Sequence, residues 1–221
     1  MNNKHLTVYW GEELGRYGFG EDHPLGQDRL TAFRVAAIRE GIDRSAEIAV
    51  PVACNVTDLI LFHEPEYVQR VEELSTIGEG YLDCGDTPAH PGIYDAGRFV
   101  VGTGLAAINR ILKHDWHHAF VPIGGLHHAR RDGAAGFSVF NDCGIMIEAL
   151  RRRFGIVRLA YVDIDAHHGD GVYYAFEEDP DLAIADIHED GRYLYPGTGA
   201  ANEEGKGIAR GTKLNIPLAP G

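Results

Sequence analysis

Short apolar runs alternate along the chain with longer stretches in which apolar residues recur at helical spacing. The short runs predict strands at residues 6–10, 119–123, 159–164, 182–187 and 212–216. Helical spacing predicts helices at residues 28–40, 94–113, 141–153 and 172–178, and Pro65 indicates a first helical turn near residue 64. The alternation predicts an α/β fold, namely a single domain with a mostly parallel sheet flanked by helices.

No repeat, low-complexity tract or linker divides the chain, so we expect one domain over residues 1–221. Ligands of open α/β folds bind beyond the carboxyl ends of the strands. Three predicted strands end in polar residues, with His127 and His128 after the first, Asp163 to Gly171 after the second, and Asp186 and His188 at the third. If these strands are adjacent and parallel, their ends meet. The glycine-rich residues 191–211 predict a long functional loop.

Composition narrows the choice of partners. A formal net charge of −13 argues against a nucleic-acid partner and favours a cationic substrate or basic peptide, although solubility alone also explains it. Cys54, Cys84 and Cys143 are in no CxxC arrangement, which is typical of reduced thiols. The first five residues are polar, and no apolar run approaches the roughly 18–20 residues of a membrane span. We therefore expect a soluble cytoplasmic protein without a membrane partner.

The exit of the strand at residues 159–164 carries the most unusual chemistry. The run Val162-Asp163-Ile164-Asp165-Ala166-His167-His168-Gly169-Asp170-Gly171 places three carboxylates and two imidazoles beside a buried strand. Burying them is costly unless a cation or a hydrogen-bond network uses them. Asp163 and Asp165 share one face of the strand, so one can reach a metal and the other an imidazole. Asp170 opens the next helix, where it either orients a histidine or caps the first turn.

Several motifs together resemble the histone deacetylase superfamily, most closely its bacterial acetoin-utilization deacetylase branch. They are Gly124-Gly125-Leu126-His127-His128-Ala129, Gly136-Phe137-Ser138-Val139-Phe140-Asn141-Asp142, the run from Asp163 to Gly171, and Tyr195-Pro196-Gly197-Thr198-Gly199. The stretches Asp22-His23-Pro24-Leu25 to Arg29 and Leu61-Phe62-His63-Glu64-Pro65-Glu66-Tyr67-Val68 also fit. The resemblance covers almost the whole chain with its motifs in order, and it implies the arginase/deacetylase-like form of the α/β fold.

The resemblance implies a role for each matching residue. Asp165 and His167 would be two ligands of a catalytic Zn²⁺, with Fe²⁺ as the alternative metal. His127 and His128 would be tandem catalytic histidines, supported by Asp163 and Asp170 respectively. Substrate would contact Gly136, Phe137, Tyr195 and, at the rim, Asp86, although ordinary core packing is the alternative for Phe137 and Tyr195. Backbone around Asp163, Asp165 and His167, with Asp186 and Ile187, matches a structural K⁺ site of the family, in which serine is common at the position of Asp186.

The implied reaction is amide hydrolysis, in which a metal-activated water and the His–Asp pairs remove an acetyl group. The substrate would be a protein carrying acetyl-lysine or another acetylated amine. Two other functions stay open. An arginase-type ureohydrolase with two manganese ions would share the fold, and a non-catalytic acyl-lysine-binding module would share the tunnel. The oligomeric state has no signature in the sequence.

The chain departs from the family pattern at one end. The family's third zinc ligand, an Asp, follows the segment matched here by residues 215–218, and its catalytic tyrosine, in a Gly-Gly-Tyr context, comes later still. A truncated piece of a longer polypeptide explains this departure better than a natural short form. With only Asp165 and His167 as ligands, we expect residues 1–221 alone to bind zinc weakly and to hydrolyse little acetyl-lysine.

Overall fold

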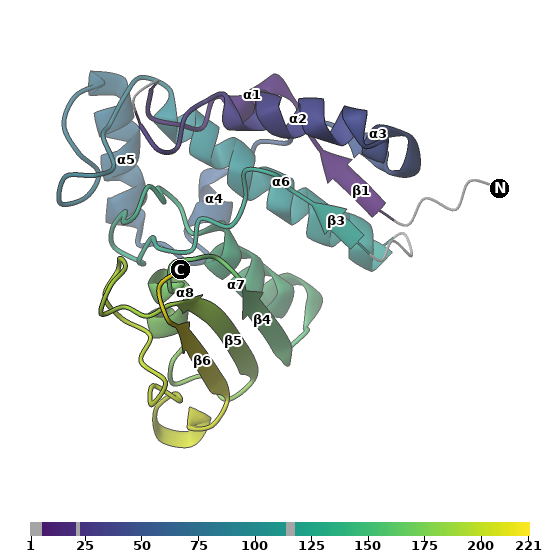
Figure 1. The fold of residues 1–221 in the computed structure, drawn as a ribbon. Helices are drawn as coiled ribbons and strands as arrows, with labels where there is room; N and C mark the ends of the chain where they lie inside the picture. The colour runs from purple at the N-terminus through teal and green to yellow at the C-terminus, as the bar shows by residue number, and fades with distance from the viewer. Residues whose placement is uncertain (1–5, 21–22, 114–117) are drawn as a thin grey trace.

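The computed structural model describes residues 6–20, 23–113 and 118–221 (Figure 1). Asp22 and the first five residues, on which predictions above bear, lie outside them. The strands are β1 (Leu6–Tyr9), β2 (Glu47–Ala49), β3 (His118–Phe120), β4 (Leu159–Asp163), β5 (Leu182–Glu189) and β6 (Lys213–Leu218). The helices are α1 (Glu12–Gly15), α2 (Arg29–Arg39), α3 (Ile42–Ser45), α4 (Val56–Leu59), α5 (Pro65–Ile77), α6 (Ile93–Lys113), α7 (Asp142–Phe154) and α8 (Asp170–Ala175), with a 3₁₀ turn η1 (Gly207–Ala209).

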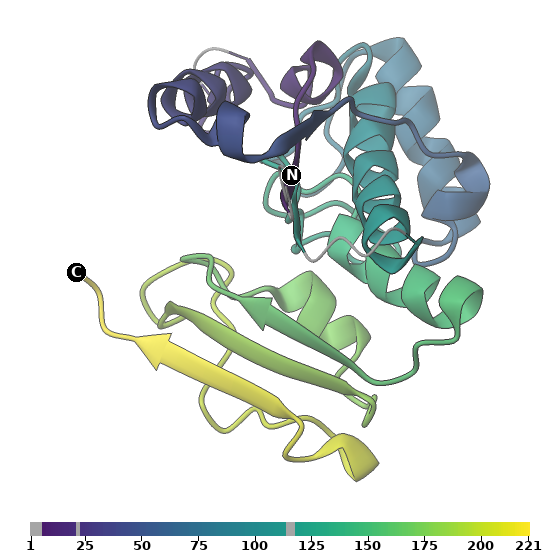
Figure 2. The same ribbon diagram turned by 90° about the vertical axis from the view of Figure 1, so that its right-hand side faces the viewer.

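The strands form two separate parallel sheets, ordered β2-β1-β3 and β4-β5-β6. Both views place β4, β5 and β6 on one side of the molecule and the other sheet on the opposite side (Figure 1, Figure 2). The predicted α/β single domain with parallel strands and flanking helices is therefore confirmed. Of the three strands whose ends would meet if they were adjacent, only β4 and β5 are paired, because β3 pairs with β1 in the other sheet.

Helix α6 packs against α1, α4, α5, α7 and β3, and its small residues let neighbouring segments approach closely. An added Cβ at Gly102 would lie 2.2 Å from the carbonyl oxygen of Val52, and one at Gly97 would lie 2.8 Å from the ring of Phe140. Cys54 donates its backbone N–H to the carbonyl of Arg98 in the same helix. This close packing fixes the position of Phe140 just before α7, and therefore also the position of the residues that precede Phe140.

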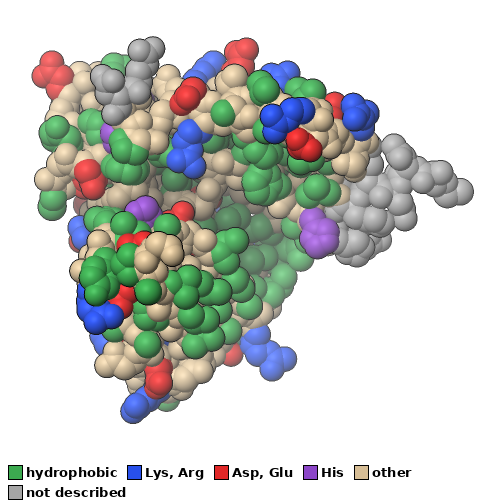
Figure 3. Space-filling model, viewed as in Figure 1, with side chains coloured by type: hydrophobic (Ala, Val, Ile, Leu, Met, Phe, Trp, Pro, Cys, Tyr) green, Lys and Arg blue, Asp and Glu red, His purple; other side chains and the backbone are tan. Residues whose placement is uncertain are grey.

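One face of the β4-β5-β6 sheet is apolar and uncovered among the described residues. Val162, Ile187, Leu214 and Leu218 are all exposed on it. Figure 3 shows hydrophobic side chains gathered over this sheet. Parallel sheets usually carry cover on both faces, so this face differs from the opposite one, against which α8 packs.

Each helix within residues 6–20, 23–113 and 118–221 is too short or too polar to cross a membrane.

Candidate active site

His127 lies in the loop after β3, and its side chain reaches the end of β4. Its Nδ1 lies 2.6 Å from Oδ2 of Asp163, and both side chains are buried. The carboxylate of Asp163 also accepts the hydroxyl of Tyr161 at 2.5 Å and the backbone N–H of Asp165 at 3.0 Å. The structure therefore brings together the first predicted His–Asp pair, although Asp163 ends a strand of one sheet and His127 follows a strand of the other.

His128 makes the second contact of this kind. Its Nδ1 lies 2.7 Å from Oδ1 of Asp170, the first residue of α8. The helix has Gly169 as its N-cap and no side-chain cap, so helix capping does not explain Asp170. The two imidazoles meet directly, with His127 Nε2 3.1 Å from His128 Nε2.

The contact between the two Nε2 atoms limits how the protons are arranged. Each Nδ1 donates its hydrogen to a carboxylate, so one Nε2 must also carry hydrogen for the two to bond, and that ring is an imidazolium. Burial acts to lower the pKa of His127, but the hydrogen bond and charge of Asp163, with the charges of Asp165 and Asp186, outweigh it and raise the pKa. Burial lowers the pKa of His128 despite the Asp170 bond. These opposite pKa shifts favour His127 over His128 as the ring that carries the extra proton.

Asp163 is held in its charged form. Burial acts to raise its pKa, but the hydrogen bond from His127 and the positive charge of that ring, together with the Tyr161 hydroxyl, lower the pKa to about 2. An ionised carboxylate and an imidazolium in contact satisfy one another inside the protein.

Asp142 and Asn141, for which the sequence predicts no role, fix the loop that carries the two histidines. The buried carboxylate of Asp142 accepts the backbone N–H groups of Gly125 and Leu126, at 3.0 and 2.7 Å. The side-chain amide of Asn141 donates to the carbonyls of His127 and Ala129. Both belong to a family-like motif, but the sequence gives no sign that their partners lie 12 to 17 residues upstream.

Asp165 and His167 form a more exposed pair. Oδ1 of Asp165 accepts both the backbone N–H of His167, at 2.8 Å, and a contact from His167 Nδ1, at 2.9 Å. Burial acts to raise the pKa of Asp165, and these hydrogen bonds outweigh it and lower the pKa. A carboxylate oxygen and an imidazole nitrogen thus lie in contact, and both are donor types that zinc binds.

Two donors are fewer than a catalytic zinc site uses, since three protein ligands are usual. No group of three or more His, Cys, Asp or Glu residues that could hold a metal ion occurs in residues 6–20, 23–113 and 118–221. The described residues fit zinc as part of a ligand set, and the role of both residues as ligands stays a prediction.

A cavity of about 260 Å³ joins the paired histidines to these donors. It is lined by Pro24, Leu25, Arg29, Pro122, Ile123, Gly124, Gly125, Leu126, His127, His128, Gly136, Phe137, Ser138, Asp165 and His167. The Phe137 ring packs at 4.4 Å, between ring centroids, against His23. The structure therefore places Gly136 and Phe137 beside the histidines, as a substrate-contacting role requires.

A second cavity, of about 330 Å³, contains the other two predicted substrate contacts. Its lining is Asp83, Cys84, Gly85, Asp86, Arg130, Ala134, Ala135 and Tyr195. The Tyr195 ring stands edge-on to His128 at 5.1 Å and is 43% exposed, so core packing is the wrong interpretation for it. Hydrogen bonding with Asp83, partial burial and the Asp83 charge raise the pKa of Asp86 to about 6.

Asp186, a predicted neighbour of the monovalent cation, is fully buried and has two close partners. Its Oδ1 lies 2.6 Å from His188 Nδ1, and its Oδ2 accepts the backbone N–H of Gly169 at 2.9 Å. His188 Nε2 contacts the carbonyl of Gly199 at 3.0 Å. His188 is thus a buried structural histidine, and the K⁺ site stays a prediction.

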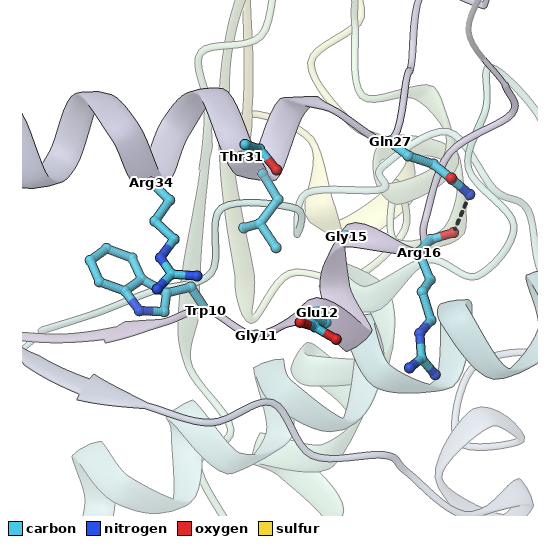
Figure 4. Close-up of a pocket in the computed structure, with 9 residues that line it drawn as sticks. Trp10, Gly11, Glu12, Gly15, Arg16, Gln27, Thr31 and Arg34 are labelled. Atoms are coloured by element: carbon cyan, nitrogen blue, oxygen red, sulfur yellow. Dashed lines mark hydrogen bonds between the residues drawn. The ribbon is translucent and has the colours of Figure 1, made fainter.

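A further cavity, of about 400 Å³, lies away from all of these residues, between the end of β1 and α2 (Figure 4). It is lined by Trp10, Gly11, Glu12, Gly15, Arg16, Gln27, Leu30, Thr31 and Arg34. Its polar side chains are exposed, and the Gln27 amide donates to the backbone carbonyl of Arg16 at 3.2 Å. It contains none of the predicted site residues.

Comparisons with known proteins show which family this chain is similar to. A family model described as histone deacetylase domain matches residues 23–221. The acetoin utilization protein AcuC of Bacillus subtilis (strain 168) is 36% identical over 210 residues, which are 91% of this chain and 54% of that protein. Histone deacetylase 6 of Arabidopsis thaliana is 30% identical over 228 residues, which are 99% of this chain and 48% of that protein. The chain thus spans about half the length of these relatives.

Two solved structures are similar in fold. The HD domain of HDA15 superposes with a TM-score of 0.89 at 25% identity, covering 99% of this chain and 64% of that one. A histone deacetylase homologue from Aquifex aeolicus gives a TM-score of 0.84 at 27% identity, covering 98% of this chain and 60% of that one.

Proposed function

Because this chain belongs to the histone deacetylase family, we propose that the protein containing it is a metal-dependent amidohydrolase that removes acetyl groups from acetyl-lysine or a related acetylated amine. The observation that carries the proposal is the pair of His–Asp contacts, at 2.6 and 2.7 Å, whose imidazoles meet at 3.1 Å beside Asp165 and His167. Folding alone rarely requires two carboxylate–imidazole pairs, one buried and one partly buried, beside one cavity.

The proton arrangement suggests separate tasks for the two histidines. Asp170 accepts the Nδ1 hydrogen of His128, so Nε2 is the atom of that ring that would take a proton from the attacking water. In this structure His128 Nε2 contacts His127 Nε2 at 3.1 Å, and the water would have to replace that contact. Asp163 stabilises the His127 imidazolium, which supplies positive charge next to the reacting amide and a proton for the departing amine.

Asp165 and His167 would hold the metal together with at least one ligand outside their pair. We propose zinc, with iron as the alternative. When bound, the ion would polarise the acetyl carbonyl and lower the pKa of water. A monovalent cation near Asp163 and Asp186 belongs to the same proposal.

The proposed substrate enters between Phe137 and Tyr195, with Asp86 at the rim. Gly136 lets these parts approach, since an added Cβ would lie 2.5 Å from the His128 ring and 2.9 Å from the Tyr195 ring. A net charge of −13 favours a cationic protein or amine over nucleic acid. The three free cysteines suit the cytoplasm, where we propose that the protein acts.

Steady-state kinetics of the intact protein would test the proposal. We expect acetate release from an acetyl-lysine peptide or from acetylputrescine, and a loss of about 10²–10⁴-fold in kcat for His128→Asn. Binding of the peptide without acetate release would instead indicate an acyl-lysine-binding module. Urea release from arginine with two bound manganese ions would indicate a ureohydrolase, an alternative that no structural observation favours over the family assignment.

A further inference from the structure

The backbone that carries Phe137 has an unusual conformation. Ala135 and Ser138 bridge each other through two backbone hydrogen bonds, at 3.2 and 2.8 Å, so Gly136 and Phe137 form a two-residue turn. Both turn residues have positive φ, 50° and 66°, as in a type I′ turn. Glycine accepts this conformation readily, but a phenylalanine rarely adopts it, so the surroundings must hold Phe137 there.

The hydroxyl of Tyr17 braces one side of this turn. It donates to the carbonyl oxygen of Phe137 at 2.7 Å and accepts the backbone N–H of Val139 at 2.9 Å. Tyr17 is only 1% exposed, and burial raises its pKa well above the usual range, so the hydroxyl keeps its hydrogen. One buried group therefore bonds the backbone on both sides of Ser138.

The hydroxyl of Thr87 braces the other side. It accepts the backbone N–H of Phe137 at 3.2 Å and donates to Oδ2 of Asp83 at 2.6 Å. Asp83 also accepts the backbone N–H groups of Gly85, Asp86 and Thr87, which fixes the rim loop around Asp86. The Thr87 hydroxyl thus joins the rim loop to the turn of Phe137.

We propose that Tyr17 and Thr87 are positioning residues that hold the Phe137 ring as a wall of the active-site cavity and thereby limit the length of the acyl group accepted. Neither residue lines that cavity. Both bond the Phe137 backbone, so their influence on substrate passes through the orientation of the ring. This inference rests on the proposed deacylase function and adds a determinant of acyl-chain specificity to it.

Amide hydrogen exchange by NMR would test the brace on this chain without any need for catalysis. In Thr87→Val the Phe137 amide should exchange about fivefold faster, and in Tyr17→Phe the Val139 amide should do so. Tyr67→Phe is the matched control, because the Tyr67 hydroxyl is equally buried and donates to the carbonyl of Val139, yet does not touch Phe137. Unchanged exchange at both amides, or an equal change in the control, would overturn the brace.

Acyl-chain specificity of the intact protein would test its consequence. We expect the preference for acetyl-lysine over butyryl-lysine, measured as a ratio of kcat/KM values, to fall about tenfold in Tyr17→Phe and Thr87→Val, because a loosened wall admits the longer chain. Thr87→Ser keeps the hydroxyl and should restore the preference, and Tyr67→Phe should retain it. A ratio identical in all four variants would refute the specificity role. A wild-type protein that removes neither acyl group would refute the proposed function instead, while hydrogen exchange still decides the brace.

Discussion

Two histidine–aspartate contacts in this protein look similar in distance and differ in surroundings. His127 and Asp163 meet at 2.6 Å with side chains 6% and 7% exposed, whereas His167 and Asp165 meet at 2.9 Å with side chains 40% and 52% exposed. The first contact joins segments 36 residues apart, and the second lies within one turn of backbone. The folded protein thus places the pair proposed to handle protons in its interior and leaves the two proposed metal ligands open to solvent.

This difference in burial suggests different roles for the two pairs. A buried pair must be satisfied at all times, so Tyr161 and the Asp165 backbone N–H complete the hydrogen bonds of Asp163. An exposed pair can give up its internal hydrogen bond and bind a metal ion instead, because water can hydrogen-bond to the side chains when they separate. The carboxylate with fixed partners, Asp163, and the one whose partner can be exchanged, Asp165, therefore lie two residues apart in sequence.

Stability should show the largest difference between the two contacts. His127→Ala leaves Asp163 as a buried carboxylate without its cation, so we expect a loss of about 3–5 kcal/mol in the free energy of unfolding. His167→Ala removes an exposed contact and should cost at most about 1 kcal/mol. Urea denaturation of both variants at pH 7 measures the two values. Equal losses would mean that burial does not separate the contacts.

A buried histidine without a carboxylate should respond to pH in the opposite sense to His127. Burial lowers the pKa of His63 to about 4, and its ring nitrogens contact the carbonyl of Arg131 and the N–H of Asn141. Between pH 6.5 and 4 the unfolded chain therefore binds one more proton than the folded protein at this position. The free energy of unfolding should fall by about 3 kcal/mol over that range and level off below it.

Urea denaturation across this pH range, compared with His63→Gln, isolates the contribution. The variant should lose the part of the slope that corresponds to about one proton. If the variant and the wild-type protein keep parallel curves, His63 does not titrate in this range.

Zinc affinity should show the smallest of the three effects, because two donors bind weakly. We expect Asp165→Ala to lower the zinc affinity of residues 1–221 by about tenfold or more, measured by competition with a chelating dye. Asp190→Ala is the matched control, since Asp190 likewise accepts the backbone N–H and side chain of the residue two positions later, Arg192. Equal losses in both variants would show that zinc binds the acidic surface in general rather than this pair.

The sequence pattern located most of the long elements, and the errors have physical causes. Helices α2, α6 and α7 and strands β4, β5 and β6 lie within a few residues of their predicted ranges, and α5 begins at Pro65, close to its predicted first turn. The short elements α1, α3, α4 and β2 were missed, since three or four residues are too few to show periodicity. The run at residues 119–123 leaves the sheet after Phe120, because its last residues turn into the histidine loop.

The site was predictable where its chemistry is local in sequence. Asp163 and Asp165 are two positions apart, so strand alternation alone suggested that they share one face and serve one site. Asn141, Asp142, Tyr17 and Thr87 act through hydrogen bonds to backbone that is 12 to 122 residues distant. No local sequence pattern predicts those distant partners, so these hydrogen bonds can be identified only from the folded structure.

The turn at the rim of the second cavity has a practical consequence. Cys84 is exposed there, within the loop that Asp83 fixes, whereas Cys54 and Cys143 are buried and burial raises the pKa of each thiol. A thiol reagent should therefore attach at Cys84 alone. A fluorophore on that sulfur would stand beside Asp86 and Tyr195 and would report when a ligand arrives, without any engineered cysteine.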